Sequence, residues 1–173
     1  INFGIIYGIS PYGLSAQLDI SNSEAKQYIE SYFKKYPGIK EYMDKTVKDC
    51  RSKGYVATPF GRRIFIPFIN DKVANRRNFA ERSAINAPIQ GGAADLIKLA
   101  MPKIYKFLTK EKLMSKMLIQ VHDELIFEVP QNEINIMKDN IPTIMSNSHN
   151  NFLDLKVPIK VDLGLGINWD EAN

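Results

Sequence analysis

Residues 119–125 read IQVHDEL, and this stretch decides the fold because two adjacent carboxylates interrupt a β-rich run. The β-rich segment 116–129 continues on both sides of Asp123-Glu124, which predicts a β-hairpin with these two residues at its tip. Asp-Glu is poor turn chemistry, since tight two-residue turns favour Asn-Gly or Asp-Gly. Carboxylates placed there suit a hard divalent cation such as Mg²⁺, although an isolated acidic pair is also typical of a plain exposed turn.

Before the hairpin, residues 1–54 follow helical patterns. Ser21 and Glu24 form a capping box, and the apolar residues that follow repeat at helical spacing as a predicted core stripe: Ala25, Tyr28, Ile29, Tyr32, Phe33 and Tyr36. Pro37-Gly38 is predicted to break that helix. The next helix is predicted to bury Ile39, Tyr42, Met43, Val47 and Cys50 and to end at Gly54.

A long helical stretch is predicted from about 73 to 110, interrupted at Pro88 and again at Pro102. Three shorter elements complete the pattern: a hairpin within 55–67, a helix at 132–145 and a last strand at 157–163. Helices first and a helix-backed antiparallel sheet afterwards indicate an α+β chain in two parts.

Composition narrows the function class. The chain has 173 residues, of which 45% are hydrophobic and 24% are charged, as in ordinary globular proteins. Its one cysteine, Cys50, excludes an internal disulfide and favours a reducing compartment. No apolar run approaches the roughly 18 residues of a membrane span, so we expect no membrane partner. The first residues lack a signal peptide and a start methionine, which indicates a chain cut from a longer protein.

The positive charge is concentrated in one window. All six arginines lie between residues 51 and 82, where eight cations face two carboxylates, while the whole chain has a net charge of +4. Because arginine pairs with phosphate through a planar fork of donors, a polyanion is one natural partner. A solvated loop with scattered charge is the other interpretation.

Arg82, Asn86 and Gln90 are spaced four residues apart, which places three hydrogen-bonding side chains on one helix face. Pro88 should kink the helix so that this stripe follows a curved partner. Such donors suit the DNA minor groove, where every base pair presents acceptors at similar places. A polar helix face in solvent would show the same spacing.

The opening stretch, residues 2–8, reads NFGIIYG. Phe3 and Tyr7 lie one helical turn apart, Gly4 leaves room beside them and Gly8 is predicted to end the helix. Aromatic rings beside small residues can form a platform for a base or a sugar, although a buried aromatic pair has the same pattern.

Taken together, four stretches in this order resemble the family A DNA polymerases of the bacterial polymerase I kind. NFGIIYG resembles the end of motif B in the fingers, and VHDE at 121–124 resembles motif C in the palm. TPFGRR at 58–63 and ERSAINAPIQGGAAD at 81–95 resemble family stretches between them. The resemblance covers essentially the whole chain and implies a fingers segment at 1–77 and the C-terminal part of a palm at 78–173, an incomplete right-hand polymerase.

The resemblance implies template-directed transfer of dNTPs to a primer 3′ end by a two-metal mechanism with Mg²⁺. Asp123 would be a metal ligand and catalytic residue, and Glu124 an auxiliary catalytic carboxylate. His122 would contact the primer terminus. Phe3 and Tyr7 would bind the incoming nucleotide and the templating pair, whereas Arg82, Asn86 and Gln90 would hold the primer–template.

The family also uses residues that this sequence does not contain. An Arg and a Lys that grip the triphosphate are expected upstream of Ile1, together with the motif A aspartate, its strand and the thumb. We therefore expect that this chain needs the rest of the polymerase as its partner and is inactive alone.

Two other functions compete with this one. A non-catalytic DNA-binding module could keep the fold and the groove stripe. A hydrolase with His122 and Asp123 as metal ligands ranks last, because the second histidine, His149, is predicted in a polar loop. The predicted location is the bacterial cytoplasm, in replication-linked repair, and an organelle homologue is the alternative.

Overall fold

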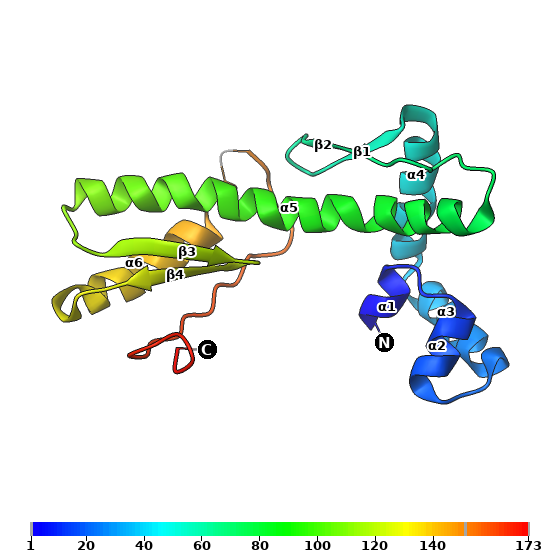
Figure 1. The fold of residues 1–173 in the computed structure, drawn as a ribbon, viewed down its shortest axis with the longest axis horizontal. Coiled ribbons are helices and arrows are strands. Elements are labelled where there is room, and N and C mark those ends of the chain that lie inside the picture. The colour runs from blue at the N-terminus through cyan, green and yellow to red at the C-terminus, as the bar shows by residue number, and fades with distance from the viewer. Residues whose placement is uncertain (1, 151, 173) are drawn as a thin grey trace. The chain divides into compact units, whose positions relative to one another are not determined.

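The computed structural model describes residues 2–150 and 152–172, with the backbone alone for residues 2 and 3. The chain divides into two compact units, an N-terminal unit of residues 1–90 and a C-terminal unit of residues 91–173. Helices dominate, and each unit contributes a two-stranded antiparallel sheet, β1-β2 in the first and β3-β4 in the second (Figure 1). These elements confirm the predicted α+β class. The fingers–palm boundary at 77/78 concerns subdomain identity, which this division does not test, and it stays a prediction.

The N-terminal unit begins with four helices: α1 (Asn2–Ile6), α2 (Pro11–Leu18), α3 (Asn22–Lys35) and α4 (Pro37–Lys53). Local sequence sets their ends. Ser10 and Ser21 cap α2 and α3 with their hydroxyls, and the Glu24 carboxylate accepts a hydrogen bond from the Ser21 backbone N–H, which confirms the capping box. The Ser21 hydroxyl also holds the pKa of Glu24 below its ordinary value. Gly54 ends α4 in the left-handed region, as predicted.

The predicted core stripe of α3 is only partly buried. Ala25 is fully buried, but Tyr28 and Tyr36 are 60% and 44% exposed, so the prediction was wrong for these two rings. The tyrosine phenols can face water while part of the ring packs, and Tyr36 packs at 5.1 Å from the ring of Tyr32. On α4, Cys50 is buried, whereas the four other residues of its predicted face are half-buried.

A small core holds the β1-β2 hairpin. β1 (Tyr55–Ala57) pairs antiparallel with β2 (Arg63–Phe65), as predicted, and Gly61 turns the chain with a φ of +86°. Val56 and Ile64 form the inward-facing pair, because alternate residues point to opposite faces of a sheet. The core cluster of this unit consists of Cys50, Val56, Ile66, Ile69, Ala80 and Ala84.

The helix α5 runs without interruption from Ala74 to Lys110, so the predicted breaks at Pro88 and Pro102 are wrong. An internal proline removes one hydrogen bond and costs about 3 kcal/mol. Burial on either side offsets that cost, with Ala84 and Ile85 before Pro88, and Ala100 and Ile104 flanking Pro102. The helix bounds do not measure a bend, and the kink at Pro88 stays a prediction.

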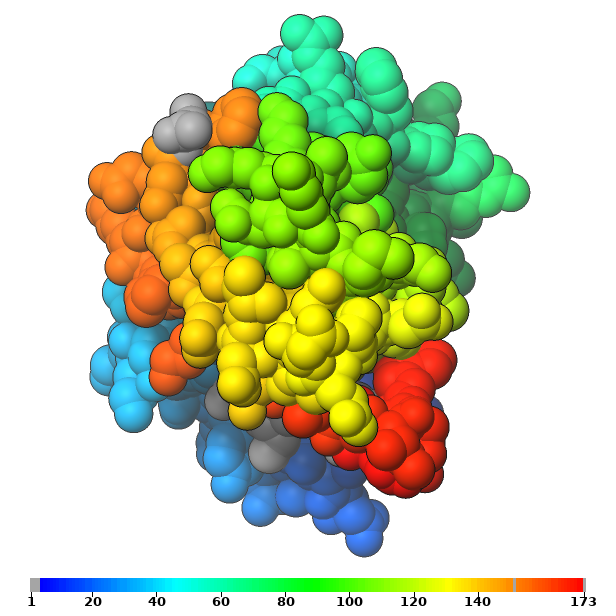
Figure 2. Space-filling model, turned by 90° about the vertical axis from the view of Figure 1, so that its left-hand side faces the viewer, coloured from blue at the N-terminus to red at the C-terminus, as the bar shows by residue number. Residues whose placement is uncertain are grey.

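The C-terminal unit places a hairpin beside helices (Figure 1). β3 (Lys116–Val121) pairs antiparallel with β4 (Glu124–Glu128), and after the short η1 (Gln131–Glu133) the chain forms α6 (Ile134–Ser146), where a helix was predicted. Its core cluster joins α5 to α6 through Ala100, Ile104, Leu108, Met137 and Ile141, with Leu125 and Phe127 of β4 packed against it. Figure 2 shows the end of α5, the segment near residue 130 and α6 gathered on one face.

Glu133 fixes the entry to β3. Its carboxylate accepts hydrogen bonds from the backbone N–H of Met114 at 2.8 Å, from that of Ser115 at 2.8 Å and from the Ser115 hydroxyl at 2.6 Å. These bonds, chiefly that from the Ser115 hydroxyl, hold the pKa of Glu133 below its ordinary value. The carboxylate therefore ties the start of the hairpin to the start of α6.

Glu133→Gln is expected to destabilise the protein at neutral pH and much less in acid. The pKa of Glu133 is lower in the folded state than in the unfolded state. As pH falls, the unfolded state therefore binds a proton at Glu133 first, and this favours unfolding. The stabilisation is complete above about pH 4.5 and is lost as pH falls through the lowered folded value. Urea unfolding at several pH values measures the difference from the wild type. Glu128→Gln, an exposed carboxylate of the same hairpin, is the control, and an equal pH dependence in both variants would contradict the assignment.

The predicted strand at 157–163 is wrong, since the structure describes residues 152–172 without a strand. Val157 is 73% exposed and Ile167 is 91% exposed. A β-strand needs a hydrogen-bonded neighbour, and alternating apolar residues alone do not supply one. The end of the chain instead folds back on itself (red hook in Figure 1), and it brings the carbonyl of Ala172 so close to Gly164 that a side chain there would collide with it.

Candidate nucleic-acid and metal site

The hairpin tip differs by one residue from the prediction. Val121 pairs with Glu124 in the ladder, so the two-residue turn is His122-Asp123, and Glu124 is the first residue of β4. The prediction of Asp123-Glu124 as the tip was therefore wrong by one position. The apolar runs on both sides did not contain the information needed to fix this register, which depends on the conformation of the turn.

His122 has a φ of +51°, a left-handed conformation that only a few per cent of non-glycine residues adopt. The Gln120 side chain donates to the His122 carbonyl at 3.2 Å and braces this turn. Strained backbone conformations are often found at functional sites, where they are retained because they position a side chain that the function needs.

The side chains of His122, Asp123 and Glu124 are all exposed. Hard cations such as Mg²⁺ are bound by one or two carboxylates together with substrate phosphates and water, and the exposed carboxylates of Asp123 and Glu124 fit that requirement. In the part of the chain that the structure describes, no group of three or more His, Cys, Asp or Glu residues could form a complete metal site. The tip therefore offers two carboxylates, and substrate phosphates and water would supply the other ligands of a cation.

The stripe on α5 occupies a single uninterrupted helix, so Arg82, Asn86 and Gln90 share one face as predicted. Arg82 and Gln90 are exposed, while Asn86 is half-buried. The buried Oδ1 of Asn86 accepts no hydrogen bond from the described residues. An unsatisfied buried oxygen is costly, so Asn86 needs a donor that another molecule or water could supply.

The arginine-rich window is largely committed to internal contacts. Arg51 pairs with Glu81, Arg77 lies 3.9 Å from the same carboxylate, and Arg76 lies 3.7 Å from Asp71. Arg63 stacks over Tyr55, and Arg62 also has a partner. Within the described ranges, Arg82 alone among the six has no hydrogen bond, ion pair or ring contact, which leaves its guanidinium available to an external acceptor.

α1 brings the nucleotide-binding candidates beside this stripe. The Gln90 side-chain amide donates to the Tyr7 hydroxyl at 3.3 Å. Gly8, with a φ of +79°, approaches Arg82 so closely that a Cβ there would lie 3.3 Å from its Cγ. Phe3 belongs to α1, but its side chain lies outside the described part of the structure. Residues 83 positions apart in sequence thus meet in one surface.

Gly8→Ala is expected to destabilise the N-terminal unit by about 1–2 kcal/mol, the cost of a left-handed conformation for an L-residue. The new methyl group would also crowd the Arg82 side chain. Thermal unfolding measures the loss of stability. Gly38→Ala is the matched control, because it meets nothing within 4 Å and stands in α4, where alanine is favoured by about 0.5–1 kcal/mol. Equal stability of the two variants would contradict the prediction.

A hollow of about 770 Å³ adjoins Arg82 in the N-terminal unit. Met43, Val47 and Ile85 supply its apolar wall, and Lys48 and Arg82 line it without an ion pair among the described residues. Its carboxylates are already engaged, Asp44 by Lys40 and Glu81 by Arg51. The uncompensated charge of the hollow is therefore positive, as a phosphate backbone requires.

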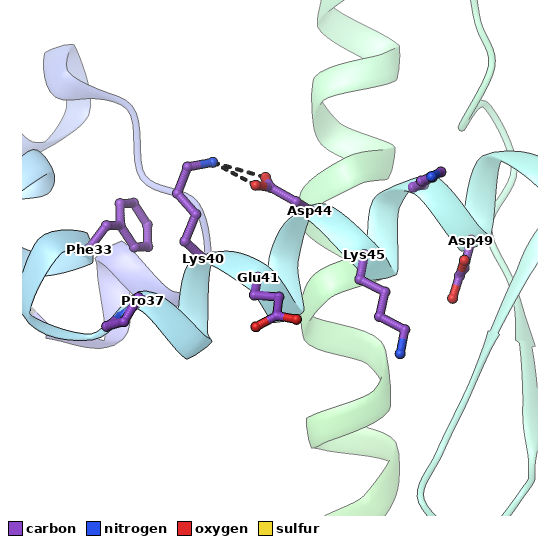
Figure 3. Close-up of a pocket in the computed structure, with 8 residues that line it drawn as sticks. Phe33, Pro37, Lys40, Glu41, Asp44, Lys45 and Asp49 are labelled. Carbon is purple, nitrogen blue, oxygen red and sulfur yellow. Dashed lines mark hydrogen bonds and ion pairs between the residues drawn. The ribbon is translucent and has the colours of Figure 1, made fainter.

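A second hollow, of about 810 Å³, runs along α4 (Figure 3). Lys40 donates to both carboxylate oxygens of Asp44, at 3.0 and 2.8 Å. The lining contains three lysines and three carboxylates, so it has no field of one sign. None of the predicted site residues lies there, and we do not assign it a function.

Two residues near Arg82, Tyr42 and Lys48, were not predicted as site residues. Tyr42 was predicted only as core, yet its hydroxyl donates to the Ile85 carbonyl at 2.9 Å and ties α4 to α5. Lys48 lines the hollow beside Arg82. The sequence contains no signal for either role, because both depend on how α4 packs on α5. Arg82 and Asp123 belong to different compact units of the chain.

Comparison with known proteins shows which family this chain resembles. The model of DNA polymerase family A matches residues 1–171. DNA polymerase I of Streptococcus pneumoniae is 49% identical over 172 residues, which cover 99% of this chain and 19% of that protein. DNA polymerase I of Rhizobium leguminosarum is 50% identical over 175 residues, covering 17% of that protein. The chain thus spans about a fifth of the length of these relatives.

The fold agrees with a solved structure, the POL domain of Pol1 from M. smegmatis in complex with DNA primer-template and dNTP. The TM-score is 0.92 at 41% sequence identity, and the match covers 99% of this chain and 30% of that one. Both of these DNA polymerase I relatives come from bacteria. None of the helices in the described ranges is long and apolar enough to cross a membrane.

Proposed function

Because this chain belongs to DNA polymerase family A, we propose that it forms part of a template-directed DNA polymerase, which transfers dNTPs to a primer 3′ end. The observation that carries this proposal is the exposed Asp123 on a strained two-residue turn, with Glu124 beside it. A strained turn with exposed carboxylates favours a role for these side chains over a plain turn.

Asp123 would hold the divalent cation, for which we propose Mg²⁺, and Glu124 would act as an auxiliary carboxylate. When bound, two such ions would supply activation of the primer 3′-hydroxyl and stabilisation of the leaving pyrophosphate. His122, braced through its carbonyl by Gln120, would orient the primer terminus. Tyr7 and Phe3 would contact the templating pair and the incoming nucleotide.

Arg82, Asn86 and Gln90 would hold the primer–template in the minor groove, whatever its sequence. The unpaired guanidinium of Arg82 supports this role, since it needs an acceptor from outside the described residues. The positive hollow beside Arg82 would accept phosphates of the same strand. Relatives of this kind lead us to place the parent enzyme in the bacterial cytoplasm.

We propose that residues 1–173 provide only part of the active site, because this chain spans about a fifth of the length of its DNA polymerase I relatives. A primer-extension assay tests both proposals. The whole polymerase should add the templated nucleotide in the presence of Mg²⁺, and the isolated chain should add none. Metal-dependent extension by the isolated chain would overturn the second proposal, and absence of extension by the whole protein would overturn the first.

A further inference from the structure

The outer face of the β1-β2 hairpin carries aromatic and cationic side chains that the proposed polymerase role does not use. Tyr55 and Phe65 are cross-strand partners, with ring centroids 5.8 Å apart in an edge arrangement. The Arg63 guanidinium lies 5.0 Å from the centre of the Tyr55 ring. Because Val56 and Ile64 point into the core, these three residues face outwards together.

The segment after β2 adds a second exposed aromatic ring beside an arginine. Phe68 is 56% exposed and has a φ of +67°, a strained conformation for a bulky residue. It is held there by its buried neighbours Ile66 and Ile69, and Arg76 lies 5.8 Å from the centre of its ring. The hairpin and its exit therefore present two arginine–aromatic pairs. We call residues 55, 63, 65, 68 and 76 the hairpin platform.

Burial and charge point to the kind of partner. Phe65 is 72% exposed, far more than a core or rigid packing role requires. Segment 55–76 contains four cations, Arg62, Arg63, Lys72 and Arg76, against the single carboxylate of Asp71. A protein-binding face of this size is usually depleted in charge at its centre, whereas aromatic rings between cations suit bases and phosphates.

We propose that the hairpin platform binds single-stranded nucleic acid, with bases stacked on Phe65 and Phe68 and phosphates held by Arg63 and Arg76. This inference rests on the proposed polymerase function, which supplies two sources of such a strand. One is the template overhang ahead of the primer, and the other is a strand displaced from the template. Stacking tolerates every base, so the platform would hold the strand without sequence preference.

The test measures the affinity of the whole polymerase for three fluorescent DNAs by anisotropy. One is a primer–template with a minimal overhang, one has a long oligothymidine 5′ overhang, and one has an annealed downstream strand with an oligothymidine flap. Phe65→Ala and Arg63→Ala should each weaken binding of one tailed DNA by about fivefold or more, and leave the minimal DNA unchanged. The tail that responds identifies the source of the strand.

Three comparisons separate stacking from charge. With an abasic tail, Phe65→Ala should have no effect, whereas Arg63→Ala should still weaken binding and reduce the salt slope by about 0.7. Phe65→Trp retains a stacking surface and should bind as the wild type does. Tyr28→Ala, an exposed ring on α3, is the matched control and should change nothing.

Unchanged affinity for both tails in Phe65→Ala and Arg63→Ala would overturn the proposal. It would also fail if the variants lost affinity equally for the minimal DNA, or if Phe65→Ala lowered only the melting temperature, which would indicate packing against another part of the polymerase. Primer extension on the minimal DNA reports the polymerase function independently. Extension with unchanged tail affinity would reject this inference alone.

Discussion

Asp123→Ala in the whole polymerase is expected to lower the rate of nucleotide incorporation by about 10³-fold or more while primer–template affinity stays nearly constant. A divalent ion at a phosphoryl-transfer site contributes several kcal/mol of transition-state stabilisation, and alanine cannot hold it. Asp123 is exposed at the hairpin tip, so its removal leaves no cavity and the fold should persist. Single-turnover incorporation and DNA titration at saturating Mg²⁺ measure the two quantities.

Asp139→Ala is the matched control, because Asp139 is an exposed aspartate of α6 in the same unit. It should retain wild-type incorporation. The competing function, a non-catalytic DNA-binding module, predicts that Asp123→Ala changes neither rate nor affinity. Retention of full incorporation by Asp123→Ala would therefore remove the metal-binding assignment, and a parallel loss of DNA affinity would indicate a general structural role.

Arg82→Ala is expected to weaken primer–template binding by about 10- to 100-fold, by a similar factor for every sequence. Its guanidinium has no ion pair or hydrogen bond within the described residues, so nothing in the fold requires the charge and an external acceptor is the remaining reason for it. Minor-groove acceptors occupy similar positions in all base pairs, which removes sequence preference. Equilibrium titration of several primer–templates over a range of salt concentrations measures the loss.

Arg77→Ala separates this effect from a general loss of positive charge. Arg77 lies on the same helix, but its guanidinium donates to the Asp71 carbonyl at 3.1 Å and neighbours Glu81. We expect it to lower stability more than DNA affinity. If both arginine variants reduced affinity equally, the unpaired state of Arg82 would have no special meaning and the groove assignment would fail.

Local signals in the sequence were sufficient for several elements. The capping box at Ser21 and Glu24 and the glycine at 54 predicted the ends of α3 and α4, because those ends depend on hydrogen bonds between near neighbours. The spacing of Arg82, Asn86 and Gln90 predicted a shared helix face, which the uninterrupted α5 confirms. The four motifs also predicted the family, and the match over residues 1–171 confirms it.

Local sequence patterns could not predict features that depend on contacts between residues far apart in the chain. Pro88 reads as a break, yet the buried Ala84 and Ile85 beside it hold α5 in one piece. The apolar alternation at 157–163 reads as a strand, but a strand forms only beside a hydrogen-bonded neighbour. The sequence also could not predict that Arg82 is unpaired, because this depends on the contacts that the other five arginines make in the folded chain.

The left-handed backbone at His122 has a consequence for any attempt to make the proposed polymerase more heat-resistant. Glycine or asparagine would adopt the same φ at lower conformational energy, so selection for thermal tolerance alone should enrich them at this position. Such variants would gain robustness and lose the imidazole next to Asp123. We therefore expect glycine or asparagine at position 122 to raise thermal stability and to lower turnover. Stabilising substitutions elsewhere in the chain would avoid this conflict.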